Sequence, residues 1–205
     1  MSYHHGDLRR ALVDAALELV AETDRWDLSL REVARRAGVS HNAPYAHFQD
    51  KGALLAAVGV RVYERLRAPT TAAAAGCGDA AEALVAIGRA YVAFGLGNAA
   101  LYRLMSGQGL AVDGRLPEPV RAAAEAARGV LREIIVRGAR DGSFDLDPDD
   151  AEEVATAVVS AWSVVHGFTL LAMDGLAARE TEIGTARLTE TTLRRFVRGL
   201  ARRGA

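Results

Sequence analysis

A run of 19 residues without Asp, Glu, Lys or Arg, from Ala155 to Met173, constrains the fold of this chain more than any other feature. A helix of this length could cross a bilayer. Hydroxyl and imidazole side chains interrupt the run, however, and acidic residues flank it with no Lys or Arg close enough to anchor a cytoplasmic end. We therefore expect a helix that is apolar on all sides and buried in a protein interface, with a membrane span as the alternative.

The composition of the remaining sequence also favours helices, because Ala, Leu, Arg and Glu dominate and Gly and Pro rarely recur at short spacing. We predict an all-α fold. The first 67 residues carry ten Arg and Lys against nine Asp and Glu, and the other residues carry fifteen against seventeen. This mild asymmetry permits a nucleic-acid surface in the N-terminal third without requiring one.

Helical spacing predicts four helices in the first 67 residues. Asp7 is the expected N-cap of the first helix. Ser29 and Glu32 form a capping box at the start of the second helix, which Gly38 ends in a left-handed conformation. Asp50 caps the fourth. The four predicted helices span residues 7–22, 29–37, 40–48 and 50–67.

An Ala/Thr/Gly-rich stretch from Pro69 to Gly78 is the expected joint between two domains, 1–67 and 68–205. The second domain is also predicted to be helical. Its expected helices span 79–97, about 100–106 and 117 to about 142, with two more that begin at Pro148 and near Thr189.

Two short helices joined by Gly-Val-Ser form a helix-turn-helix pattern between about Ser29 and Phe48. A generic helical hairpin would show the same pattern, so the side chains of the third predicted helix, which has Ser40 as its N-cap, decide between the two. Val39, Ala43 and Phe48 can face the core. The outward set carries no aliphatic side chain and consists of His41, Asn42, Tyr45 and His47.

Such a surface suits DNA, because Asn can pair with adenine and Tyr can touch a thymine methyl group or a phosphate. Lys51, at the start of the fourth helix, could meet phosphate together with the free amides of that helix. Pro44 lies in the first turn of the third helix, where it lacks a donor and disfavours helical geometry at Ala43. We expect this helix to be locally distorted.

These residues resemble the TetR family of bacterial regulators. The resemblance covers about 45 residues and is carried by the run from Ser29 to Ser40, Ser-Leu-Arg-Glu-Val-Ala-Arg-Arg-Ala-Gly-Val-Ser, and by Tyr45-Ala-His-Phe48 and Lys51. It implies a three-helix DNA-binding domain, linked by a fourth helix to a larger helical domain that binds a small effector and dimerises through its last two long helices. It further implies base-side roles for Arg31, His41, Asn42 and Tyr45, and phosphate contacts from Ser29, Tyr45, His47 and Lys51.

The sequence departs from the family at Ala43-Pro44, where many members have Thr followed by an apolar residue. Ser40 to Tyr45 instead resembles a subgroup with a His-Gly pair in the penultimate long helix, which His166-Gly167 fits. In that subgroup a Trp directly precedes the His, whereas Trp162 lies earlier here.

A set of mostly aromatic side chains recurs at helical spacing in the second domain. We interpret these side chains as the lining of an apolar effector pocket. The alternative is that these side chains simply pack in the core. For His166 the alternative is a core histidine that is hydrogen-bonded to a carbonyl or a hydroxyl group. The candidates are Tyr91, Phe94, Tyr102, Met105, Trp162, His166 and Phe168.

No metal, cofactor or catalytic site is predicted. His41 and His47 fall on different faces, the acidic stretch 145–150 lacks the Gly and Glu of a calcium loop, and no nucleophile elbow or phosphate-cradling loop occurs. An α-helical enzyme, or a helical interaction protein without DNA affinity, remains the competing class. The lone Cys77 and an N-terminal stretch unlike a signal peptide lead us to expect a cytoplasmic protein.

The two helices that begin near Pro148 and Thr189 carry more apolar surface than one domain can cover. We therefore expect a homodimer built as a four-helix bundle around a two-fold axis. Two recognition helices related by that axis imply an inverted-repeat operator in double-stranded DNA.

Overall fold

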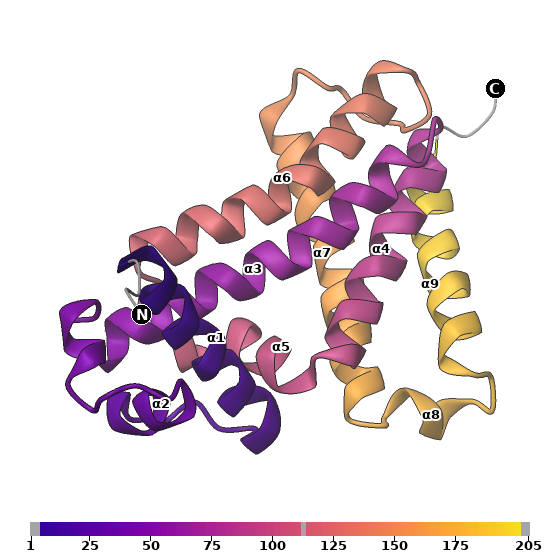
Figure 1. Ribbon diagram of the computed structural model, residues 1–205. Coiled ribbons are helices and arrows are strands. Elements are labelled where there is room, and N and C mark those ends of the chain that lie inside the picture. The colour runs from indigo at the N-terminus through magenta and orange to yellow at the C-terminus, as the bar shows by residue number, and fades with distance from the viewer. Residues whose placement is uncertain (1–4, 112–113, 202–205) are drawn as a thin grey trace. The chain divides into compact units, whose positions relative to one another are not determined.

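The computed structural model describes residues 5–111 and 114–201, and it confirms the all-α prediction. Residues 1–4, from the N-terminal stretch discussed above, lie outside the described residues. The chain folds as two compact units: residues 1–64 with 98–124 form the first, and residues 65–97 with 125–205 form the second. Regular structure in the described ranges is helical, and the bridge between Phe144 and Ala201 is isolated. Figure 1 labels the helices along the chain.

The first unit is built on the N-terminal helices and a later segment of the chain. Its core includes fully buried aliphatic side chains, Leu12, Leu17 and Val33 among them, where α1 packs against α2. Its elements are α1 (His5–Thr23), α2 (Leu30–Arg36), the 3-10 helix η1 (Ala43–Ala46), the first part of α3 (Lys51–Ala75), α5 (Ala99–Ser106), the 3-10 helix η2 (Gln108–Leu110) and the first turns of α6 (Glu118–Arg140).

The segment 98–124 packs with the first unit, although the predicted boundary at residue 67 places it in the second domain. Trp26 lies against Gly109, where an added Cβ would meet the indole nitrogen at 3.0 Å. Leu110 lies so close to Gly59 that an added Cβ there would be 2.7 Å from its methyl group. These contacts join residues far apart in sequence, and the division of the chain by function remains a prediction.

The second unit packs α4 (Ala80–Gly97), α7 (Ala151–Met173) and α9 (Thr185–Leu200) side by side, with the short α8 (Ala177–Glu180) between the last two (Figure 1). Close approach is possible because Gly88 on α4 faces Leu193, whose methyl carbon would lie 2.6 Å from an added Cβ. Gly138 on α6 is similarly covered by the buried ring of Phe144.

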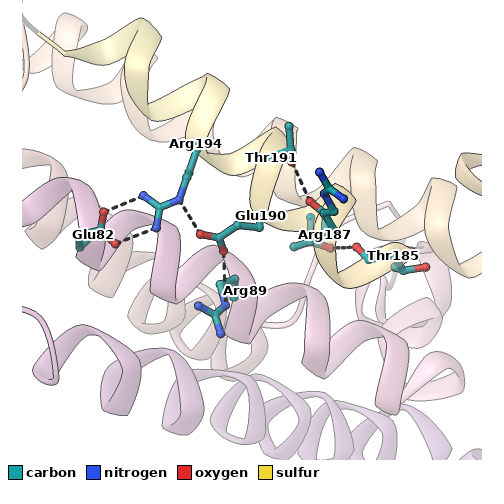
Figure 2. A network of polar contacts seen from close by, with 8 residues as sticks. Glu82, Arg89, Thr185, Arg187, Glu190, Thr191 and Arg194 are labelled. Carbon is teal, nitrogen blue, oxygen red and sulfur yellow. Dashed lines mark hydrogen bonds and ion pairs between the residues drawn. The ribbon is translucent and has the colours of Figure 1, made fainter. Parts of the chain in front are cut away.

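An exposed polar network links α4 to α9 at their shared surface (Figure 2). Arg194 donates through Nη1 and Nη2 to the carboxylate of Glu82, at 2.7 and 3.1 Å, and through Nε to Glu190, at 2.6 Å. Arg89 lies 3.7 Å from the second oxygen of Glu190. Because Glu82, Arg89 and Arg194 are exposed and Glu190 is half-buried, we expect the network to orient the two helices and to contribute only modestly to stability.

The charge-free run forms most of α7, as predicted. By length and composition alone, both α4 and α7 could cross a membrane, but α4 is half buried and packs against α7 and α9. In α7 only 28% of the most apolar window is buried, and the large side chains of Val159, Trp162 and Leu171 stay exposed. The second unit therefore leaves apolar surface of α7 uncovered.

Helix α3 continues through Pro69 to Ala75, so most of the stretch predicted as the joint between domains is helical. Proline removes one backbone donor inside a helix. The hydroxyl of Thr70 donates to the carbonyl oxygens of Leu66 and Arg67, at 3.1 and 2.9 Å, and an alanine run with high helix propensity follows. The high helix propensity of these alanines favours continuation of the helix past the proline.

Three predicted helix starts also need correction. Helix α1 already begins at His5, so Asp7 is inside it rather than its N-cap. Helix α7 begins after Asp150, whose carboxylate accepts from the amides of its first turn, and not at Pro148. Helix α9 begins at Thr185 and not near Thr189. The buried Thr189 lies within the helix, where its hydroxyl donates to the Thr185 carbonyl.

Candidate nucleic-acid interface

Helix α2 presents one apolar and one basic face. The Ser29 hydroxyl accepts from the Glu32 amide at 3.1 Å, which confirms the predicted N-cap. Leu30, Val33 and Ala34 are buried on the face of α2 that meets α1. Arg31 is exposed on the remaining surface, so the burial of the apolar stripe fixes the direction in which this arginine can reach.

Gly38 ends α2 in the left-handed conformation, with φ of 69°, as predicted. The Val39 amide donates to the Ala34 carbonyl at 3.0 Å, which closes the helix end. A side chain at position 38 would be strained at this φ, and glycine avoids that strain. The chain therefore turns sharply between α2 and the residues that follow.

The predicted third helix, 40–48, is wrong in extent, because only Ala43–Ala46 is helical and its geometry is 3-10. Asn42, not Ser40, precedes its first residue. The Phe48 and His47 amides both donate to the Pro44 carbonyl at 2.9 Å. Pro44 itself is buried and packs into the interior.

The expected distortion at Pro44 is therefore larger than a local bend. A proline in the first turn lacks the amide that would extend a regular helix toward Ser40. Val39 and Ala43 are only half-buried, whereas Phe48 is 2% exposed. The buried side chains of Pro44 and Phe48 therefore attach the segment to the core. We call residues 40–47 the recognition turn.

None of the predicted DNA-contact residues is buried. Tyr45 is the most notable, because 54% of a large aromatic residue is left exposed on the recognition turn. His47 and Lys51 are half-buried. The exposed members of the set are Ser29, Arg31, Ser40, His41, Asn42 and Tyr45.

The start of α3 differs in one respect from the phosphate site predicted for it. The carboxylate of Asp50 accepts from the Ala53 amide at 2.8 Å, so one of the helix-terminal amides is already bonded. Lys51 remains as the positive group there. The pKa of the Asp27 carboxyl is lowered mainly by the hydrogen bond from Arg25, and the charge of Lys51 contributes to the same shift.

Several arginines near this surface are neutralised by carboxylates. Arg36 donates to both oxygens of Glu22, which lowers the pKa of Glu22, and it also reaches Glu18 at 3.4 Å. By contrast, no ion-pair partner for Arg31 or Lys51 occurs among the residues that the structure describes. The unneutralised charge thus lies beside the recognition turn.

The predicted effector residues fall in both units. Tyr102 and Met105 are buried core residues of the first unit, where the Tyr63 hydroxyl donates to the Met105 carbonyl at 3.5 Å. The others belong to the second unit, and the structure brings three of those together.

His166 is the centre of that group. Its Nδ1 lies 3.2 Å from the Tyr91 hydroxyl, and its ring centroid lies 5.8 Å from that of Trp162. Burial lowers the pKa of His166 and favours the neutral imidazole. Phe94 is buried, Phe168 is half-buried, and Trp162 is 36% exposed.

Sequence reasoning missed Arg128, whose guanidinium carbon lies 5.5 Å from the centroid of the Trp162 ring. It also missed Arg9, which lies over the ring of Phe48. Neither contact leaves a local signal, because the partners are far apart in the chain.

Within residues 5–111 and 114–201, no three His, Cys, Asp or Glu side chains gather to hold a metal ion.

Two family models match the chain. Residues 12–58 match the model described as bacterial regulatory proteins of the tetR family, and residues 84–196 match the model described as a tetracyclin repressor-like C-terminal domain. The curated HTH-type transcriptional regulator BetI of Escherichia coli is 41% identical over 59 residues, which are 29% of this chain and 30% of that protein. The match thus spans less than a third of this relative's length.

Solved structures match the chain over nearly its whole length. A protein described as of unknown function, from Rhodococcus sp. RHA1, has a TM-score of 0.84 and 30% identity, over 98% of this chain and 100% of that one. The transcriptional regulator FadR of Bacillus subtilis, solved in complex with stearoyl-CoA, has a TM-score of 0.72 over 93% of this chain and 98% of that one. At 15% identity, the second likeness shows the fold alone.

Proposed function

Because the chain belongs to the TetR family of bacterial regulatory proteins, we propose that it is a transcriptional regulator that binds double-stranded DNA. In this proposal it acts in the cytoplasm as a repressor, and a small-molecule effector releases it from its operator. The family models support a regulator rather than an enzyme.

The observation that carries the proposal is the exposure of the recognition turn above two buried residues. Pro44 and Phe48 are buried beneath it, while Asn42 and Tyr45 face solvent. An exposed Asn amide can pair with the adenine edge, and Tyr45 supplies an apolar ring with a hydroxyl for thymine or phosphate. Ser29, Arg31, Ser40, His41, His47 and Lys51 surround them as further proposed contacts.

A homodimer follows from the uncovered apolar surface of the second unit. Val159 and Leu171 of α7 are 54% and 48% exposed, and Trp162 lies between them in sequence. A second copy of the chain that packs its own α7 and α9 on this surface would remove it from water. The interface of such a pair is isologous, so its two recognition turns are related by a two-fold axis and require an inverted-repeat operator.

The effector is proposed to be largely apolar and to bind in the C-terminal domain. Phe94 and Phe168 supply apolar surface there, and the Tyr91–His166 pair supplies one polar point. Trp162 completes the proposed set, whereas Tyr102 and Met105 pack in the core of the first unit. The FadR structure named above contains stearoyl-CoA, which is apolar over most of its acyl chain and supports this choice of class. Such a ligand can lower DNA affinity only by its differential affinity for the free and DNA-bound states.

Selection of bound duplexes from a random pool tests the DNA-binding proposal. We expect enrichment of one inverted repeat, bound by two protomers, with affinity that falls steeply as salt rises. A helical enzyme or interaction protein would enrich no sequence.

Sedimentation at micromolar concentration tests the proposed homodimer. A protein that sediments as a monomer would contradict it.

The selected duplex then allows small apolar molecules to be screened for release of the protein. We expect an effector to weaken DNA binding and, reciprocally, to bind less tightly to the DNA complex. A molecule that binds the protein tightly and leaves the DNA affinity unchanged would contradict this mechanism.

A further inference from the structure

Arg9, in α1, lies against the residue that closes the recognition turn. Its guanidinium carbon is 5.2 Å from the centroid of the Phe48 ring. Phe48 directly follows His47 and is 2% exposed, so its position is fixed by the core. A guanidinium over an aromatic ring is attracted by the ring's negative face. Phe48 therefore holds the Arg9 head group at the edge of the recognition turn.

The charge of Arg9 is not neutralised. Two nearby arginines of the first unit do have carboxylate partners: Arg10 lies 3.7 Å from Asp14, and Arg25 lies 2.9 Å from Asp27. For Arg9, no ion pair or hydrogen bond occurs within residues 5–111 and 114–201, and the residue is exposed. Its N–H donors thus remain available to a ligand.

Phosphate is the ligand that this arrangement fits best. A guanidinium presents five donors in a planar fork that matches phosphate oxygens in two-point geometry. The contact with Phe48 limits the positions that the long side chain can adopt, which reduces the entropy lost on binding. In addition, Arg9 belongs to α1, outside the helix-turn-helix. A contact from there to the DNA backbone would help to fix the orientation of the bound protein on the duplex.

We propose that Arg9 is a phosphate-binding residue of the DNA interface, held in place by the ring of Phe48. This inference rests on the proposed function and extends its contact surface to α1. Because phosphate contacts carry no sequence information, Arg9 strengthens binding to operator and unrelated duplex alike. It also releases counterions from DNA, so it contributes about 0.9 to the salt slope for each phosphate contacted.

The test uses the full chain and the duplex enriched from the random pool, with affinities measured from roughly 50 to 200 mM salt. Three variants are compared with the wild type. Arg9→Gln and Arg9→Met both remove the charge, and the second keeps an apolar stem over Phe48, so a loss of folding in one leaves the other informative. Arg10→Gln is the matched control, because it removes the same charge one residue away, where Asp14 already neutralises it.

We expect Arg9→Gln and Arg9→Met to lower the salt slope by about 0.9 per bound protomer. They should weaken binding to operator and to unrelated duplex by the same factor. Arg10→Gln should leave the slope close to that of the wild type. The proposal is overturned if the Arg9 variants change the slope no more than Arg10→Gln does, or if they weaken only operator binding. If the wild type binds no duplex at all, the proposed function itself fails, and this result is distinct from a wild type that binds with no contribution from Arg9.

Discussion

The hydroxyl oxygen of Tyr91 on α4 lies 3.2 Å from Nδ1 of His166 on α7. The contact joins two helices of the second unit. It agrees with the interpretation of His166 as a histidine bonded to a hydroxyl, and it leaves a role in effector binding as a proposal. Burial, rather than a charged neighbour, lowers the pKa of His166.

This lowered pKa predicts a loss of stability in mild acid. The unfolded chain takes up a proton near the usual histidine pKa of about 6.5, while the folded chain resists it, so the free energy of unfolding falls as the pH drops below that value. We expect the wild-type unfolding midpoint to fall more steeply between about pH 7 and pH 5 than that of His166→Gln. Thermal unfolding followed by circular dichroism measures both.

Tyr91→Phe is the control for this pH effect. Because burial causes the pKa shift, loss of the hydroxyl should leave the pH dependence in place. Equal pH dependence in the wild type and in His166→Gln would show that His166 does not titrate as the structure indicates.

Two glycines of α6 should respond to alanine in opposite directions. An added Cβ at Gly138 would lie 2.3 Å from the ring of Phe144, which is buried and cannot move aside, whereas Gly129 has nothing within 4 Å. We expect Gly138→Ala to destabilise the protein by about 1–3 kcal/mol through overpacking. Gly129→Ala should stabilise it by about 0.4–1 kcal/mol through lower entropy of the unfolded chain. Urea unfolding of both variants checks the signs, and the same sign for both would refute the packing described at Gly138.

The polar network in Figure 2 predicts a salt- and acid-sensitive contribution to stability. Hydrogen bonds and charge attraction from Arg194 lower the pKa of Glu82, so the interaction is present above the usual glutamate pKa of about 4.3 and is lost as the pH falls through the lowered value. Arg194→Gln should lower the unfolding midpoint at neutral pH. The difference from wild type should shrink at high salt and at acid pH.

Arg198→Gln serves as the matched control for that network. Arg198 lies on the same helix, and no ion pair for it occurs in the described part of the chain. An equal effect of both substitutions, or an Arg194 effect that does not change with salt, would argue against the network.

Local patterns predicted the helical elements well, and the family membership they suggested is confirmed. The Ser29 cap and the left-handed Gly38 were predictable because each depends on a few adjacent residues. The continuation of α3 past Pro69 was not predicted, because a proline inside a helix removes a backbone donor and usually ends or kinks the helix.

Contacts between distant segments were beyond sequence reasoning. Tyr102 and Met105 have the spacing of pocket residues, yet they pack in the first unit with Tyr63. The recognition turn also differs from the predicted helix, because burial of Pro44 shortens it to a 3-10 helix. The side chains predicted to face outward there are nevertheless at the surface, since Phe48 fixes the segment from below.

The affinity of Tyr45→Ala for the enriched inverted repeat tests the central claim most directly. Tyr45 is 54% exposed, so its truncation should leave the unfolding midpoint unchanged while DNA binding, measured by fluorescence anisotropy, weakens at least about tenfold, or about 1.4 kcal/mol. Leu96→Ala, which truncates another exposed apolar side chain in the second unit, should leave the affinity unchanged. An unchanged affinity in folded Tyr45→Ala would contradict the account that the recognition turn contacts DNA.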